Sequence, residues 1–152
     1  MRRILCGLVG VYVGATVGLA ASSGKVLKVL PHYLDLQGRH AVSPSLYERD
    51  AYQADLRRHP ERISGLRFDI HWQASHATSA PLRLRAELLT TTSSKEKPIV
   101  LEQAVKPGFL GRRWSPVKLD GAAFKAAGEL IAWRVTLWEG DTQLGEQRSF
   151  LW

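Results

Sequence analysis

The most informative pattern in the chain is a strict alternation of apolar and polar residues. Between Leu66 and Trp72 every second residue is apolar, and the same alternation runs from Leu82 to Leu88. A longer stretch, from Leu130 to Trp138, also alternates, and its apolar row is expected at Ile131, Trp133, Val135 and Leu137. Because successive side chains of a strand point to opposite faces, each stretch predicts a β-strand with one face in a core and the other in water.

Shorter strand candidates complete the predicted sheet structure. They are residues 25–31, 99–105, 114–119 and 143–152. Pro116 lies inside the third of these, and since proline has no backbone N–H to donate, we expect an edge strand there. About seven short strands, most of them separated by turn residues, predict a mainly β fold with a single antiparallel β-sandwich.

One segment departs from this pattern and predicts a short helical insertion on the N-terminal side of the sandwich. Residues 44–58 are rich in helix formers and end just before Pro60. Ser43 before Pro44 is one candidate for the capping residue, and Ser45 with Glu48 offers a second possible capping box. The apolar positions of residues 44–58 form only a narrow stripe, made of Leu46, Tyr47, Ala51 and Ala54. We therefore expect a surface helix that packs against a larger element. Residues 120–128 predict one or two further helical turns, ended by Gly128.

The first 24 residues have the layout of a secretory signal peptide. Arg2 and Arg3 precede an apolar run over residues 4–20 that ends in small residues. This predicts export to the periplasm or the extracellular space, with cleavage after Ala20 or Ser22. The alternative is an anchor in the inner membrane, because residues 4–24 carry no charge and are long enough to span hydrocarbon as a helix.

These patterns divide the chain into three parts. Residues 1–24 are expected to be a signal peptide or membrane anchor, residues 25–64 a short strand with the helical embellishment, and residues 65–152 the sandwich. A length of 152 residues suits one domain, and 45% hydrophobic with 23% charged residues is the composition of a globular protein. The single cysteine, Cys6, lies in the N-terminal segment, so no internal disulfide is expected.

Charge narrows the classes of partner. The formal net charge is +7, and removal of Arg2 and Arg3 would leave +5. The basic residues are scattered along the strands, which is typical of solvated strand faces and not of a nucleic-acid site. An anionic partner outside the cytoplasm would be an acidic glycan or lipid headgroups.

Two blocks of sequence resemble a known family. The run LRFDIHW followed by LRLRAEL resembles strands B and C of a fibronectin type III or immunoglobulin-like domain. The block from Lys118 to Phe150 is similar to the E–F corner, F strand and F–G hairpin of the same fold. Trp133 stands where the corner tyrosine of the family is often found, and the family's inter-sheet disulfide has no counterpart. The resemblance implies a sandwich over residues 66–152 but no activity, because such folds host unrelated functions.

The sequence contains no pattern typical of a catalytic centre. It has no GxSxG, no HExxH and no phosphate-binding loop, so we expect no enzyme activity and no cofactor. One alternative is a metal-binding or hydrolytic domain that uses His71, His76 and Asp69, which could meet at strand ends. We favour the interpretation that His71 belongs to the polar, solvent-facing row of its strand.

Tryptophans provide the main hypothesis on function. Trp72 and Trp133 lie in predicted core rows, whereas Trp138 lies in an outward row and Trp114 precedes the predicted edge strand. Aromatic residues outside a core often mark contact surfaces. Together with the basic neighbours Arg112 and Arg113, Trp114 and Trp138 predict a binding surface for another envelope protein. Strand addition at an open sheet edge would suit such a partner.

Three other interpretations remain beside this one. The helix over residues 44–58 could cover the outer sheet and bury Trp138. Exposed tryptophans and tyrosines could make the domain a glycan-binding module. The aromatic end of the sequence, Ser149–Trp152, is also found in small outer-membrane barrels, although Glu146 and Arg148 share the row that would have to face lipid.

Overall fold

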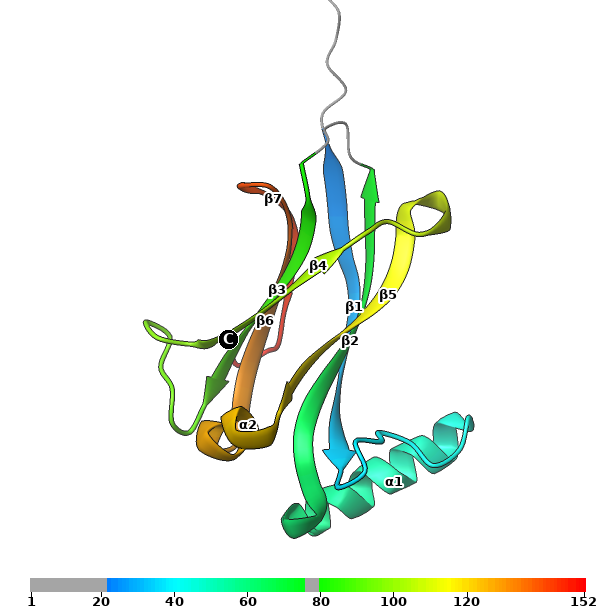
Figure 1. Ribbon diagram of the computed structural model, residues 1–152, viewed down its shortest axis with the longest axis vertical. Helices are drawn as coiled ribbons and strands as arrows, with labels where there is room; N and C mark the ends of the chain where they lie inside the picture. Colours follow the sequence, from blue (N-terminus) through cyan, green and yellow to red (C-terminus); the bar gives the residue numbers. More distant parts are fainter. Residues whose placement is uncertain (1–21, 76–79) are drawn as a thin grey trace, which may run out of the picture.

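The computed structural model describes residues 22–75 and 80–152 and shows two antiparallel sheets packed against each other (Figure 1). The three-stranded sheet has the order β1-β2-β5, with bounds Ser23–Asp35, Ile63–Ser75 and Arg112–Asp120. The four-stranded sheet has the order β4-β3-β6-β7, with bounds Ile99–Val105, Leu82–Thr90, Leu130–Glu139 and Thr142–Arg148. The predicted mainly β, sandwich-like architecture is confirmed.

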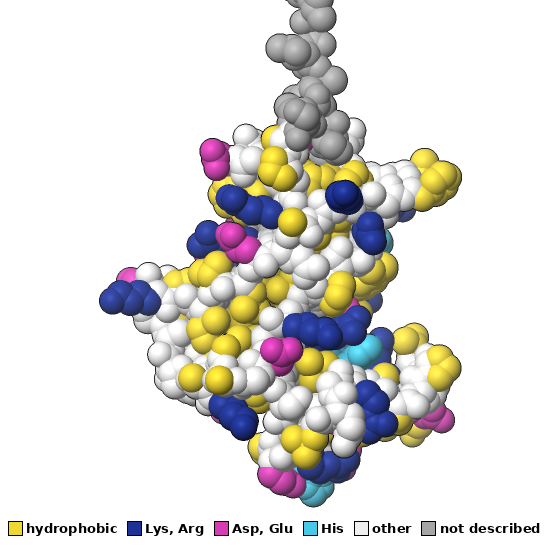
Figure 2. Space-filling model, in the orientation of Figure 1, with side chains coloured by type: hydrophobic (Ala, Val, Ile, Leu, Met, Phe, Trp, Pro, Cys, Tyr) yellow, Lys and Arg dark blue, Asp and Glu magenta, His cyan; other side chains and the backbone are white. Residues whose placement is uncertain are grey.

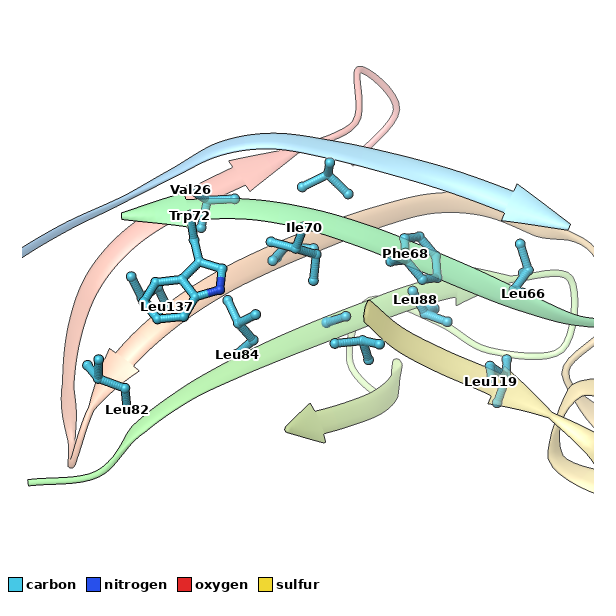
Figure 3. Close-up of a cluster of buried hydrophobic side chains, with 14 of the residues drawn as sticks. Val26, Leu66, Phe68, Ile70, Trp72, Leu82, Leu84, Leu88, Leu119 and Leu137 are labelled. Atoms are coloured by element: carbon cyan, nitrogen blue, oxygen red, sulfur yellow. The ribbon is translucent and has the colours of Figure 1, made fainter. Parts of the chain in front are cut away.

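The core lies between the sheets and is built from the predicted apolar rows. Phe68, Ile70 and Trp72 of β2 have no exposed surface, and neither do Leu84 and Leu88 of β3. These side chains point toward one another across the space between the sheets (Figure 3). Each fully buried side chain of this size contributes about 1.5–3 kcal/mol relative to an exposed one, so the two alternating rows hold the sheets together.

Strand β6 departs from its predicted alternation at one end. Val135 and Leu137 are buried as expected, but Ile131 is 45% exposed and Leu130 packs against the core instead. The cause is an irregularity in the pairing with β3, where the partners of two consecutive β3 residues are Ala132 and Leu130, so that Ile131 is skipped. An extra residue of this kind is a β-bulge, which reverses the facing of the residues beyond it.

One side of the sandwich closes where β1 meets β7 of the other sheet. Gly24 and Gly145 allow this approach, because a Cβ on Gly24 would lie 2.8 Å from the Leu144 Cβ, and one on Gly145 would lie 2.9 Å from the Gly24 carbonyl oxygen. Both distances are too short for a side chain to fit without a shift of the backbone.

The remaining elements lie at the far ends of the strands. Helix α1 spans Leu46–Arg58, where the sequence predicted a helix over residues 44–58. Ser45 caps it, since its Oγ accepts a hydrogen bond from the Glu48 amide at 3.4 Å. Short 3-10 turns cover Pro60–Arg62 (η1) and Phe109–Gly111 (η2), and helix α2 covers Gly121–Ala127. Among residues 22–75 and 80–152, no helix has both the length and the apolar composition to cross a bilayer.

Helix α1 does not cover Trp138. It packs on the end of β1, where the Gln53 side chain accepts a hydrogen bond from the Tyr33 amide at 2.7 Å and donates to the Tyr33 carbonyl oxygen at 2.9 Å. Tyr47 of the predicted apolar stripe is 84% exposed. The hypothesis that this stripe buries Trp138 is therefore wrong, because the helix lies against the three-stranded sheet and Trp138 belongs to the other one. The predicted signal peptide or anchor, residues 1–24, lies almost entirely outside the described residues and stays a prediction.

The closure between β1 and β7 predicts that Gly24→Val destabilises the protein, while Ser23→Val on the neighbouring exposed position does not. Forcing extra methyl groups into this contact is expected to lower the free energy of unfolding by about 1–3 kcal/mol. Urea denaturation followed by tryptophan fluorescence measures the difference. Equal midpoints for the two variants would contradict the close approach of the two sheets.

Candidate functional site

The structure separates the four residues predicted to form one surface. Arg112, Arg113 and Trp114 are consecutive at the start of β5, at the edge of the three-stranded sheet. Trp138 lies in β6, on the outer face of the four-stranded sheet. Since the outer faces of the two sheets of a sandwich point in opposite directions, Trp138 cannot share a contact surface with Arg112 and Trp114, which lie on the outer face of the three-stranded sheet.

Trp114 forms a stacked pair with His71 on the outer face of the three-stranded sheet. The two residues lie directly opposite each other in the pairing of β2 with β5. Their rings are nearly parallel, at an interplanar angle of 8° and a centroid distance of 4.8 Å. Trp114 is 47% exposed. Within the described part of the chain β5 pairs only with β2, so the second face of the indole is turned toward an open sheet edge.

Basic side chains surround this pair. Lys28 lies opposite His71 on β1, and the Arg112 Nε donates a hydrogen bond to the Gln73 Oε1 at 3.1 Å. Arg113 extends the other way and contacts the Lys106 carbonyl oxygen at 3.5 Å. Arg113 lies opposite Trp72 in the pairing with β2, so it belongs to the other face of the strand. We call Lys28, His71, Arg112 and Trp114 the Trp114 surface. Its exposed charges are positive, and its centre is an aromatic ring that a ligand can reach.

The surroundings of Trp138 are different. Its indole Nε1 donates a hydrogen bond to the Thr136 Oγ1 at 2.8 Å, and the Arg83 guanidinium lies 5.5 Å from the ring centroid. Nearby on the same face, buried Glu87 accepts hydrogen bonds from Arg85 at 3.1 Å and from Arg134 at 2.6 Å. Glu87 is therefore already paired with two arginines. Sequence analysis did not identify Glu87 as the centre of this cluster. The pattern that could have indicated it is the alternation of Arg83, Arg85 and Glu87 on one face of β3.

The structure does not bring together the proposed metal ligands that it describes, Asp69 and His71, with a third ligand. Asp69 and His71 lie on the outer face of β2, and His76 lies outside the described residues. The Asp69 carboxylate instead contacts Arg67 at 2.7 Å and the His32 Nδ1 at 3.3 Å. Burial raises the pKa of Asp69, but the hydrogen bonds from His32 and Arg67 outweigh it and lower the net value. No group of three His, Cys, Asp or Glu in residues 22–75 and 80–152 is placed to hold a metal ion.

A second polar cluster, missed by sequence analysis, surrounds Asp35 at the end of β1. This carboxylate is 3% exposed and accepts hydrogen bonds from the Tyr52 hydroxyl at 2.6 Å and from the Arg39 Nε at 2.8 Å. It also accepts the backbone N–H groups of Gln37 and Arg39. The spacing of Asp35 and Gln37 is that of an Asx turn, which is the signal that could have identified it. The cluster ties the chain after β1 to helix α1.

A hollow of about 520 Å³ opens between α2 and the 3-10 turn η1. Its apolar wall includes Tyr33, Phe124 and Leu130. The charged residues that line it, Arg57, Lys125 and Glu129, include both signs. They do not define one class of ligand, and the hollow is therefore not the candidate site.

No family model, no curated protein and no solved structure matches this chain. What the fold defines is a class, a mainly β protein with two antiparallel sheets, and the Trp114 surface is its candidate site.

The Asp35 cluster predicts a specific acid sensitivity. Burial alone would raise the pKa of Asp35, but the hydrogen bonds from Tyr52 and Arg39 lower it from 3.8 to about 2. A carboxyl group whose pKa is lower in the folded state stabilises the protein above its unfolded pKa, and this stability is lost as the pH falls from 3.8 to about 2.

We therefore expect Asp35→Asn to lower the free energy of unfolding by about 2 kcal/mol at pH 7. The difference between wild type and variant should shrink as the pH falls below 4. Urea unfolding at a series of pH values measures both stabilities. A constant difference down to pH 2 would show that the charge of Asp35 does not hold the cluster together.

Proposed function

We propose that this chain is an exported binding module of the cell envelope, with an immunoglobulin-like or fibronectin type III-like fold, and that it recognises another envelope protein through the Trp114 surface. The fold is supported by the seven strands that residues 22–75 and 80–152 form in two antiparallel sheets. The chain passes from one sheet to the other between β2 and β3, β4 and β5, and β5 and β6. In a constant-type immunoglobulin domain the fourth strand joins the sheet of the first two. Here β4 pairs with β3, which favours the fibronectin type III-like alternative.

Export is supported by the first 24 residues. Two arginines followed by an apolar run and small residues are typical of a secretory signal, and the only cysteine of the chain lies in this segment. After export the domain would have no cysteine left for a disulfide, so its stability would depend on its core. Retention of residues 4–24 would place the same module on the outer side of the inner membrane.

The observation that carries the binding role is the exposed indole of Trp114 at a free sheet edge. Tryptophan and arginine are the residues most enriched at the energetic centres of protein interfaces, because each combines a large contact area with a polar group. The Trp114 side chain is already ordered by its stack on His71. It therefore loses little further conformational entropy when a partner covers its second face. Arg112 on the same face of β5 and Lys28 opposite His71 favour a partner with carboxylates.

The edge of β5 adds a second mode of contact. A strand without a neighbour on one side offers backbone N–H and C=O groups to an incoming segment. Pro116 has no backbone N–H to donate, so a segment that pairs with the open edge of β5 could not continue its hydrogen bonds past this residue. The pairing we propose is therefore limited to residues 112–115, where the backbone hydrogen bonds and the Trp114 surface would act on the same segment of the partner.

An acidic glycan is a second candidate ligand for the same surface. One open face of an indole, flanked by cations, suits a sugar ring that carries a carboxylate. This alternative uses no backbone pairing, so it does not depend on the free edge of β5.

The decisive variant pair is Trp114→Ala and Trp138→Ala. Full-length protein carrying either change is mixed with an envelope preparation and cross-linked to its partner. The variant is then captured, and the partner protein that is cross-linked to it is measured. Loss of an interface anchor costs about 2 kcal/mol or more, so Trp114→Ala should reduce capture of the cross-linked protein about 30-fold, whereas Trp138→Ala, an equal loss of volume on the opposite face, should leave it unchanged. Far-UV circular dichroism checks that both variants remain folded.

Equal capture by the two variants would contradict the assignment of this surface. Loss of retention on an acidic cell-wall polysaccharide in Trp114→Ala, without any change in captured protein, would favour the glycan-binding alternative.

A further inference from the structure

The turn between β4 and β5 presents two large apolar side chains to solvent. Phe109 is 90% exposed and Leu110 is 77% exposed, and both belong to the 3-10 turn η2. The turn projects from the body of the protein at the upper right of Figure 1, and Figure 2 shows hydrophobic side chains at the same place. Exposed apolar side chains at a projecting tip are typical of sites that contact a membrane or another protein.

The backbone of this turn is held in a strained shape. Leu110 has a φ of 54°, in the left-handed region that residues with a side chain rarely adopt. Glycines on both sides make the turn tight, because a Cβ on Gly108 would lie 2.4 Å from the Arg112 carbonyl oxygen, and one on Gly111 would lie 2.4 Å from the Ala74 carbonyl oxygen. Strain of this kind persists where the surrounding structure imposes it, and it occurs most often at functional sites. Here it turns Phe109 and Leu110 away from the protein.

The charges around the tip are positive. Lys106 precedes the turn, Arg112 and Arg113 follow it, and the whole segment 103–119 contains no aspartate or glutamate. All three basic side chains are exposed. Apolar side chains that project beyond a set of cations match the order of groups in an anionic bilayer, with phosphates outermost and hydrocarbon beneath.

The turn also lies at the end of the molecule where the described chain begins. Ser23 pairs with Ser75, and Gly111 packs against Ala74 on the same end of β2. The predicted apolar segment, residues 4–24, therefore joins the domain beside this turn, whereas helix α1 lies at the opposite end (Figure 1). A membrane that holds or has just released the N-terminal segment would therefore lie at the same end of the domain as the turn. Two acidic residues at the same end, Glu139 and Asp141, belong to the other sheet, where Glu139 ends β6 and Asp141 lies in the β6–β7 turn.

From these observations we infer that Phe109 and Leu110 insert into the surface of an anionic lipid bilayer, while Lys106, Arg112 and Arg113 contact its phosphates. This contact goes beyond the proposed recognition of an envelope protein and does not depend on it. It would orient the module with the end of the three-stranded sheet toward the membrane and leave the indole of Trp114 accessible from the side.

The test places a fluorescent probe at the tip of the turn in the full-length chain. Cys6→Ser removes the natural thiol, and Leu110→Cys is labelled with an environment-sensitive dye; Phe109→Cys provides a second site that needs no left-handed backbone. The control site is Tyr47→Cys, on helix α1 at the opposite end. Vesicles contain either phosphatidylcholine alone or phosphatidylcholine mixed with phosphatidylglycerol, and each type is also prepared with a nitroxide-bearing lipid.

The expected result is a shift of the emission to shorter wavelength at positions 109 and 110 on anionic vesicles, with quenching by the nitroxide lipid and neither effect at position 47. Arg112→Gln combined with Arg113→Gln should abolish the shift. An unchanged emission at positions 109 and 110 would overturn the inference, and so would an equal shift on neutral vesicles.

A shift that requires a soluble envelope extract and not vesicles would assign the turn to a protein interface instead, and would also overturn the inference. The outcome is independent of capture by the Trp114→Ala variant, so the two proposals can fail separately.

Discussion

The register of β2 is the constraint on which both the core and the candidate site depend. β2 is the middle strand of its sheet, so it is paired on both sides, and its inward row supplies Phe68, Ile70 and Trp72 to the core. A shift by one residue would expose that row and bury the polar one, which is why the register is strongly specified. A buried hydrogen bond also fixes this register, because the Trp72 Nε1 donates to the Ser115 Oγ of β5 at 3.0 Å. The same pairing places His71 opposite Trp114.

The two outer faces of the sandwich have different electrostatic character. On the four-stranded sheet a buried carboxylate, Glu87, is shared by Arg85 and Arg134. The guanidinium of Arg83 lies 5.5 Å from the ring centroid of Trp138, and that of Arg134 lies 5.0 Å from the ring centroid of Trp152. On the three-stranded sheet Asp69 is paired, but Lys28 projects into solvent beside the stacked pair of His71 and Trp114. A charged group that already has a partner gains little from a new one, whereas an exposed cation next to an aromatic ring leaves interactions to be made.

Much of the fold follows from local patterns, and most of the site does not. Period-two alternation predicted the buried row of β2, and Pro116 predicted an edge strand, which β5 is. Alternation assigns a residue to a face of its strand but does not say which sheet the strand joins, since that depends on contacts between residues far apart in the sequence. For this reason Trp138 and Trp114 could be grouped on one surface when they belong to different sheets. The bulge at Ile131 and the position of helix α1 likewise depend on tertiary pairing, which no local propensity records.

Nuclear magnetic resonance tests the register most directly, through nuclear Overhauser contacts between the side chains of β2 and β5. The account predicts contacts of the Trp114 indole with the His71 imidazole, together with contacts of the Trp72 indole N–H with Ser115. Contacts of the Trp114 indole with Ile70 or Trp72 in place of His71 would show a register shifted by one residue. That result would contradict both the core and the candidate site derived from it.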